Sequence, residues 1–135
     1  MILLGPGAWV ALVDRGSEHH AACVRALKDL TEPLASVWPA VSEAMNALGA
    51  VPKGQDVVWE MIERGAVRLL ELNDADVAPI RALMRRHADR GIRLADAALV
   101  HVAEREGIRT MFTVRGKEFA AYKLSGGSRR LKVIP

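Results

Sequence analysis

The chain has 135 residues, of which 50% are hydrophobic and 26% charged, so it is long enough for one globular domain and is not of the disordered class. The formal net charge of +3 mildly favours an anionic partner, although many proteins without such a partner are slightly basic. Cys23 is the only cysteine, which excludes an internal disulfide and a thiolate metal cluster and predicts a reducing, cytoplasmic setting.

The first half of the chain alternates short apolar runs with helical segments. Residues Met1 to Val13 have no basic leader and are too short to span a membrane, so neither a signal peptide nor an anchor is expected. The predicted elements are a strand at 2–4, a helix at 6–13 opened by Pro6, a helix from Ser17 to about Leu30, a strand at 34–37, a helix at 40–48 and a helix at 55–64.

The helix at 40–48 is nearly all apolar and is therefore expected to be buried. Its only polar residues are Ser42, Glu43 and Asn46. Glu43 is thus an acid in an apolar setting, unless the three form a narrow solvated stripe.

In the second half, one acid stands out because its helical neighbours are apolar. The predicted elements are a strand at 67–72, a helix from Asn73 or Asp74 to about Ala88, a helix with Asp96 near its start and Gly107 at its end, a strand at 108–114, a helical turn at 117–122, a loop at Gly126-Gly127 and a strand at 131–134. Asp96 is followed at i+3, i+4 and i+7 by Leu99, Val100 and Ala103, while His101, Glu104 and Arg105 project elsewhere. A carboxylate on an apolar seam needs a partner. The alternative is a first-turn acid favoured by the helix dipole.

Alternation of strands and helices predicts an α/β fold with a mostly parallel sheet of about five strands. Sites in such folds lie at the carboxyl ends of the strands. Gly5, Trp38 and Arg115 fall there, and Glu43 and Asp96 lie in first turns of helices that face the same crevice.

Five segments together resemble PIN-domain proteins, in particular VapC-like toxin ribonucleases. They are ALVDRGSEHHAAC at 11–23, LASVWPAVSEAMNAL at 34–48, IRALMRRHAD at 80–89, LADAALVHVAE at 94–104 and FTVRGKEF at 112–119. The resemblance covers nearly the whole chain and implies a single PIN-like three-layer α/β/α sandwich over residues 1–135. It also implies a cluster of acids that holds Mg²⁺ or Mn²⁺, an RNA substrate (tRNA or another structured RNA), a small antitoxin partner, a homodimer and no membrane association.

The resemblance assigns catalytic roles to Glu43, Asp96 and, as a secondary acid, Glu118, with Glu43 and Asp96 as metal ligands. Three positions depart from the pattern: Gly5 and Arg115 stand where acids are usual, and Arg93 replaces a further frequent acid.

These departures weaken the expected metal site. At about 4 Å and an effective dielectric constant of about 20, one charge pair is worth about 4 kcal/mol before desolvation. We therefore predict that Arg115, with Arg93, pairs with Glu43 and Asp96 and stands in for the metal, which leaves nuclease activity weak or absent. The alternatives are a non-catalytic PIN-like module that binds RNA or protein, and an Arg115 that is only a turn residue facing water.

The remaining residues of interest are basic side chains, histidines and tryptophans. Arginines 81, 85, 86 and 90 form one basic face, and Arg129, Arg130 and Lys132 form another; each is either a solvated surface or a set of phosphate contacts, with Arg85, Arg86, Arg129 and Arg130 as the possible RNA-contacting residues. Histidines 19, 20, 87 and 101 lack metal-ligand spacing and are expected to be structural or on the surface. Tryptophans 9, 38 and 59, separated in sequence, are expected in the core or at an interface rather than as base-stacking platforms.

Overall fold

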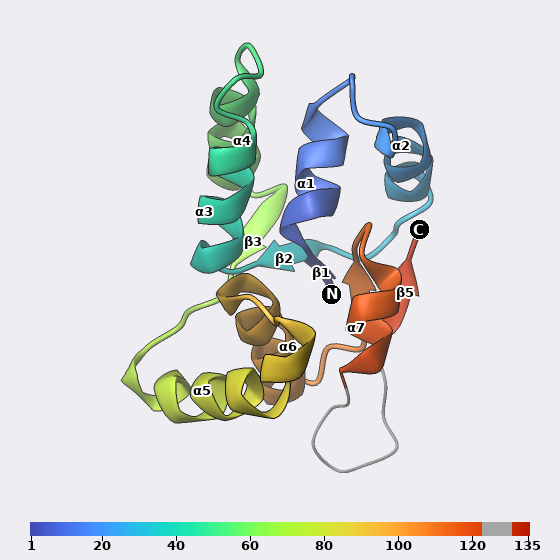
Figure 1. Cartoon of the computed structure of the whole chain (residues 1–135). Helices are drawn as coiled ribbons and strands as arrows, with labels where there is room; N and C mark the ends of the chain where they lie inside the picture. Colours follow the sequence, from blue (N-terminus) through green and yellow to red (C-terminus); the bar gives the residue numbers. More distant parts are fainter. Residues whose placement is uncertain (123–130) are drawn as a thin grey trace.

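A parallel five-stranded sheet forms the centre of the molecule (Figure 1). The computed structural model describes residues 1–122 and 131–135, and the strand order is β3-β2-β1-β4-β5 with every neighbouring pair parallel. The strands are β1 (Ile2–Leu4), β2 (Leu34–Ser36), β3 (Val67–Leu69), β4 (Thr110–Phe112) and β5 (Lys132–Ile134). The predicted parallel sheet is confirmed.

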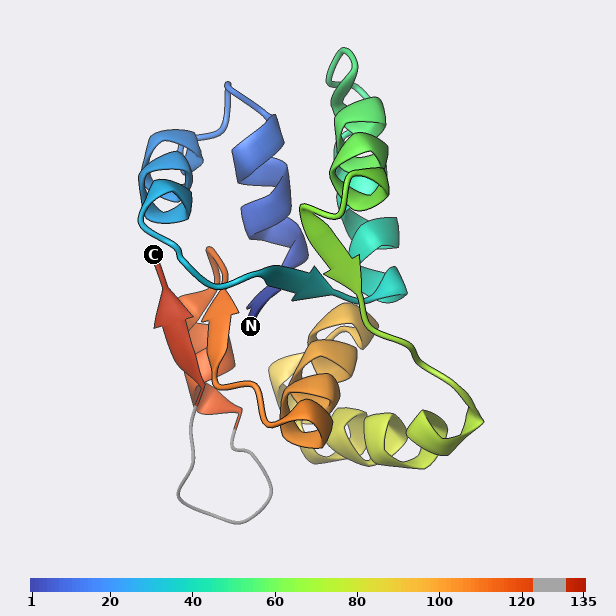
Figure 2. The same cartoon turned by 180° about the vertical axis from the view of Figure 1, so that it is seen from behind.

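Helices cover both faces of this sheet. They are α1 (Pro6–Val13), α2 (His20–Lys28), α3 (Trp38–Ala47), α4 (Gly54–Glu63), α5 (Val77–Arg86), α6 (Leu94–Glu106) and α7 (Gly116–Ala121). Seen from either side, α1 to α4 lie above the sheet and α5 and α6 below it (Figures 1 and 2). The predicted three-layer α/β/α sandwich is therefore confirmed.

Side-chain alternation along the strands explains why there are two cores. Leu3 packs into one cluster with the side chains of α6, whereas Ile2 and Leu4 pack into the other with those of α1. Both faces of β1 are apolar because it is the central strand, and Leu3 and Leu4 are fully buried.

Two predicted helix starts are shifted. The second helix begins at His20 and not at Ser17, because the Ser17 hydroxyl accepts the His19 N–H and closes a turn before the helix. Asn73 caps a 3₁₀ turn at Asp74–Asp76, from which α5 begins at Val77. Pro79 then falls in the first turn of α5, where a missing N–H does not break the helix.

The prediction that the helix at 40–48 is wholly buried is wrong. Ala40, Val41 and Ala44 are buried against neighbouring elements, but Ser42 and Asn46 are exposed, and Trp38 at the start of α3 is 53% exposed. Only one side of this helix packs on the rest of the described chain, so its apolar composition reflects small alanines and an exposed aromatic rather than full enclosure.

Two remaining expectations concern the C-terminal loop and membrane association. The Gly126-Gly127 loop, Arg129 and Arg130 lie outside the described residues. Across residues 1–122 and 131–135, no helix combines the length and the apolar character needed to cross a lipid bilayer.

Candidate functional site

The chain extends the sheet from β1 first through β2 and β3 on one side and then through β4 and β5 on the other, so the switch point lies between β1 and β4. A backbone hydrogen bond links the carboxyl ends of these two strands. The Gly5 N–H donates to the Phe112 carbonyl at 2.9 Å. Shortly after β4, the Arg115 N–H donates to the Thr113 hydroxyl at 2.9 Å, which fixes the turn into α7. A crevice at such a switch point is the usual ligand site of an open parallel sheet.

Asp96 is buried next to this edge of the sheet, in the first turn of α6, with 1% of its side chain exposed. Arg115 Nη1 donates to Asp96 Oδ2 at 2.8 Å. The other carboxylate oxygen, Oδ1, is buried and has no hydrogen-bond partner among the described residues. The predicted contact between Arg115 and Asp96 is thus present, and the alternative of an Arg115 that only faces water is wrong.

A second acid–arginine pair lies beside the first. Arg93 Nη2 is 3.6 Å from Glu43 Oε2, and both side chains are partly exposed. Helices α3 and α6 pack against each other, which brings Glu43 on α3 to the start of α6. The structure therefore brings together Glu43, Arg93, Asp96 and Arg115 as two neighbouring ion pairs.

Glu118 does not join these pairs. It lies in the first turn of α7, is exposed, and forms no ion pair with any described residue. Its proposed catalytic role stays a prediction.

Burial dominates the electrostatics of Asp96 and raises the pKa of its carboxyl above the ordinary value. The guanidinium groups of Arg115 and Arg93 act in the opposite direction, and the nearby Glu43 carboxylate adds to the rise. A buried acid held in this way is costly to the fold, which is a common property of functional sites.

The acids as they stand do not fit a tightly held Mg²⁺ or Mn²⁺. The unpartnered Asp96 Oδ1 suits such an ion, since hard cations prefer carboxylate oxygens. However, the described chain contains no group of three or more His, Cys, Asp or Glu side chains arranged to hold a metal, and Arg115 already occupies Asp96 Oδ2.

Gly5 leaves room for a side chain at this centre. A Cβ added there would lie 3.4 Å from the Phe112 carbonyl oxygen and 3.6 Å from Thr113 Oγ1, which are ordinary contacts, and Gly5 has an extended backbone with φ of −77°. The missing acid at this position is therefore a property of the sequence and is not imposed by the fold.

A second polar cluster, formed by Asp76, His101 and Arg105, was not predicted from the sequence. The His101 ring donates to Asp76 Oδ1 at 2.7 Å, and Arg105 Nη1 donates to the same oxygen at 3.0 Å. The hydrogen bond from His101 is the main cause that lowers the pKa of Asp76 to about 2. His101 is buried and not simply turned away, and its spacing of four residues from Arg105 was the signal that could have found the cluster.

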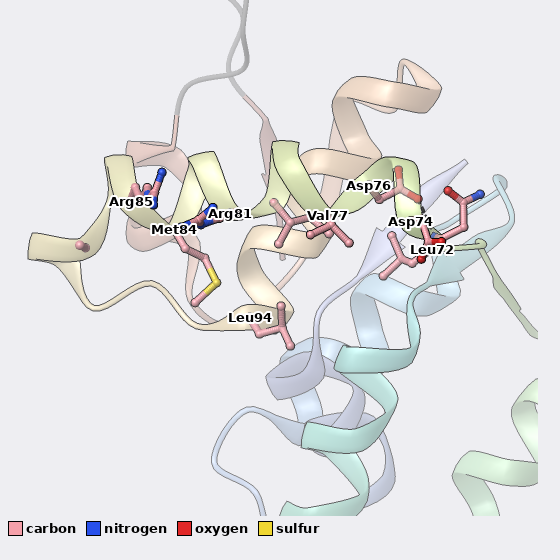
Figure 3. Close-up of a pocket in the computed structure, with 11 residues that line it drawn as sticks. Leu72, Asp74, Asp76, Val77, Arg81, Met84, Arg85 and Leu94 are labelled. Atoms are coloured by element: carbon pink, nitrogen blue, oxygen red, sulfur yellow. Dashed lines mark hydrogen bonds between the residues drawn. The ribbon is translucent and has the colours of Figure 1, made fainter.

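A pocket lies between α5 and the start of α6, and neither Glu43 nor Asp96 lines it (Figure 3). Its volume is about 850 Å³. The lining is mostly apolar (Leu72, Val77, Ile80, Met84 and Leu94), and its charged residues are Asp74, Asp76, Arg81 and Arg85. Leu94 is the first residue of α6 and directly follows Arg93 in the chain, so the pocket begins next to the site.

The tryptophans divide into one core residue and one exposed pair. Trp9 is fully buried, as expected. Trp38 and Trp59 are 53% and 48% exposed, and their ring centroids are 6.1 Å apart, so these two are not separated in space. Arg85 and Arg86 are exposed on α5, which leaves them available for the proposed RNA contacts.

Comparison with known proteins identifies the family. The PIN domain model matches residues 6–123. The chain is 28% identical to ribonuclease VapC26 of Mycobacterium tuberculosis over 137 residues, which cover 99% of this chain and 100% of that protein. The fold is similar to the crystal structure of Mycobacterium tuberculosis VapC20, described as a sarcin-ricin loop cleaving toxin, with a TM-score of 0.85, 18% identity and full coverage of both chains. It is also similar to PAE2754 of Pyrobaculum aerophilum, with a TM-score of 0.55, 22% identity and coverage of 91% and 85%. The chain belongs to the PIN-domain family, and within that family it is similar along its whole length to a VapC ribonuclease.

Proposed function

We propose that this protein acts on RNA as the toxin of a type II toxin–antitoxin pair, with phosphodiester hydrolysis that is strongly weakened. The similarity to VapC26 along the entire chain supports the RNA-directed function. The weakened hydrolysis is inferred from the 2.8 Å contact between Arg115 Nη1 and the buried Asp96. PIN nucleases generally depend on divalent metals, which are held by negatively charged carboxylates. A guanidinium in this place reduces the negative charge that would attract such a metal.

The proposed catalytic acids are Glu43, Asp96 and Glu118. Glu43 and Asp96 would be the ligands of Mg²⁺ or Mn²⁺, but each is paired with an arginine. The competing proposal of a non-catalytic RNA- or protein-binding module rests on the same two pairs, and cleavage assays distinguish the two.

Cleavage of structured RNA tests the function directly. Purified protein incubated with tRNA and with ribosomal RNA fragments in Mn²⁺ is expected to cleave at least about 100-fold more slowly than a PIN nuclease with all its acids, a loss typical of removing one electrostatic contact from an active centre. The residual cleavage should disappear in Glu43→Ala and in Asp96→Ala and persist in Arg64→Ala, a surface variant next to α4. Rapid wild-type cleavage would contradict the weakening, and cleavage retained in both acid variants would contradict the assignment.

Protein partners are proposed from the exposed apolar surface. Trp38 and Trp59 are 53% and 48% exposed and their ring centroids are 6.1 Å apart, so they form an exposed aromatic pair of the kind that marks protein interfaces. Val77 and Leu94 are 62% and 52% exposed as well. A homodimer and a small antitoxin are the partners we propose, and a cytoplasmic location is proposed from the single cysteine, Cys23.

Self-association through this surface is expected to fail in Trp38→Glu. Loss of a half-exposed tryptophan from an interface costs about 2 kcal/mol or more of association free energy, so the dimer should dissociate at least about 30-fold more readily. Light scattering coupled to size exclusion measures the mass at several concentrations. Ala21→Glu, which adds the same charge to the exposed side of α2, is the control. Equal masses for wild type and Trp38→Glu at all concentrations would rule out this surface.

A further inference from the structure

The two ion pairs at the sheet edge contain two carboxylates and two guanidiniums, so their formal charges cancel. A centre built of carboxylates alone repels a phosphodiester, and a divalent cation must reverse that repulsion before the phosphate can approach. Here Arg93 and Arg115 already supply positive charge beside Glu43 and Asp96. The two arginines therefore offset the charge of the carboxylates, so that a phosphate can approach without a metal to neutralise it.

Arg115 is also oriented for binding a phosphate. Its guanidinium donates one hydrogen bond to Asp96 at 2.8 Å, and its remaining donors have no hydrogen-bond partner among residues 1–122 and 131–135. The side chain is 29% exposed, so Arg115 is anchored by Asp96 and is still partly accessible. A guanidinium held by a carboxylate in this way presents a planar pair of N–H groups, which matches two oxygens of a phosphate.

Arg93 adds a second, looser cation. It is 51% exposed, and its contact with Glu43 is 3.6 Å, longer than an ordinary hydrogen bond. Such a side chain can leave its carboxylate at little cost, because surface ion pairs contribute little.

We propose that Arg115, positioned by Asp96 and assisted by Arg93, binds a phosphodiester of RNA at this centre without a divalent metal. The inference rests on the proposed action on RNA and adds that the arginines replace the metal in holding the substrate. Asp96 is then a positioning residue for Arg115 during binding.

Binding of a labelled RNA hairpin, measured by fluorescence anisotropy in EDTA and in Mg²⁺, tests this inference. The wild-type Kd is expected to change by no more than about 2-fold between the two conditions. Arg115→Ala should weaken binding about 10-fold in EDTA and reduce the slope of log K against log salt by about 0.7 to 0.9, the value for one lost phosphate contact. Arg115→Lys should keep the slope and bind with intermediate affinity, because it retains the charge and loses the planar fork.

Arg64→Ala is the matched control, since it removes an exposed arginine that pairs with Glu60 on α4. Arg64→Ala should bind RNA as the wild type does. A circular dichroism melt of each variant verifies folding. If Arg115→Ala does not fold, the affinity of Arg115→Lys tests the inference in its place. Wild-type binding that requires Mg²⁺, or Arg115→Ala and Arg115→Lys that both bind like Arg64→Ala, would overturn the inference and leave the RNA-directed function standing. Absence of RNA binding under both conditions would instead contradict the proposed function itself.

Discussion

The double variant Gly5→Asp/Arg115→Asp is expected to bind Mn²⁺ at least about 100-fold more tightly than the wild type, since each charge pair near a protein surface is worth up to about 4 kcal/mol before desolvation. The change removes the guanidinium from Asp96 and adds two carboxylates around it. Asp96 Oδ1, which is buried without a partner among the described residues, is then one of several oxygens available to the ion. The backbone at Gly5 accepts the Cβ of the new side chain with ordinary contacts.

Titration calorimetry with Mn²⁺ measures this gain, and the melting temperature of the double variant should rise on adding the ion. Arg115→Asp alone should show part of the effect, and Glu43→Ala in the double-variant background should reverse much of it. A double variant that folds and binds Mn²⁺ no better than the wild type would show that the departures at positions 5 and 115 are not what closes this centre to metal.

Removal of Arg115 alone is expected to destabilise the fold. Arg115→Ala leaves the 1% exposed Asp96 without its hydrogen-bonded cation, and breaking a buried ion pair from one side typically costs about 3 kcal/mol. The loss should be largest at neutral pH. Burial already raises the pKa of Asp96, and loss of Arg115 raises it further, so the folded variant binds a proton more readily than the unfolded chain. Its stability deficit should therefore shrink as the pH falls through the raised pKa of Asp96.

Urea unfolding at neutral and acidic pH measures this effect, in a double-mutant cycle with Asp96→Asn. The coupling free energy between positions 96 and 115 should be about 2 kcal/mol, and the exposed pair Arg64–Glu60 should give less than about 1 kcal/mol in a parallel cycle. A loss on removing Arg115 that is independent of residue 96 and of pH would contradict a buried, energetically coupled pair.

Local patterns were sufficient to predict the layers of the fold and the position of Asp96. Short apolar runs and helix signals give the strand–helix alternation, and the apolar residues that follow Asp96 already require a partner for it. Arg115 was predicted as the partner from the resemblance to PIN-domain proteins, because it stands where that family usually has an acid, and the structure confirms its contact with Asp96.

Contacts between segments that are distant in the sequence could not be predicted from these local patterns. Asp76 meets His101 and Arg105 only because the fold places the turn before α5 beside the later turns of α6. Similarly, the contact of Trp38 with Trp59 depends on how α3 and α4 pack. The polar residues Ser42 and Asn46 did indicate the exposed side of α3, but no local pattern indicated that Trp38 is exposed.

The Asp76 cluster and the Arg115–Asp96 contact link the two halves of α6 to different parts of the fold. His101 and Arg105 fasten the second half of this helix to the turn from which α5 starts, while Asp96 lies in the first turn of the same helix. The pocket between α5 and Leu94 adjoins both ends of this connection. A ligand in this pocket would therefore contact both Asp76, to which the second half of α6 is fastened, and Leu94, at the start of the same helix.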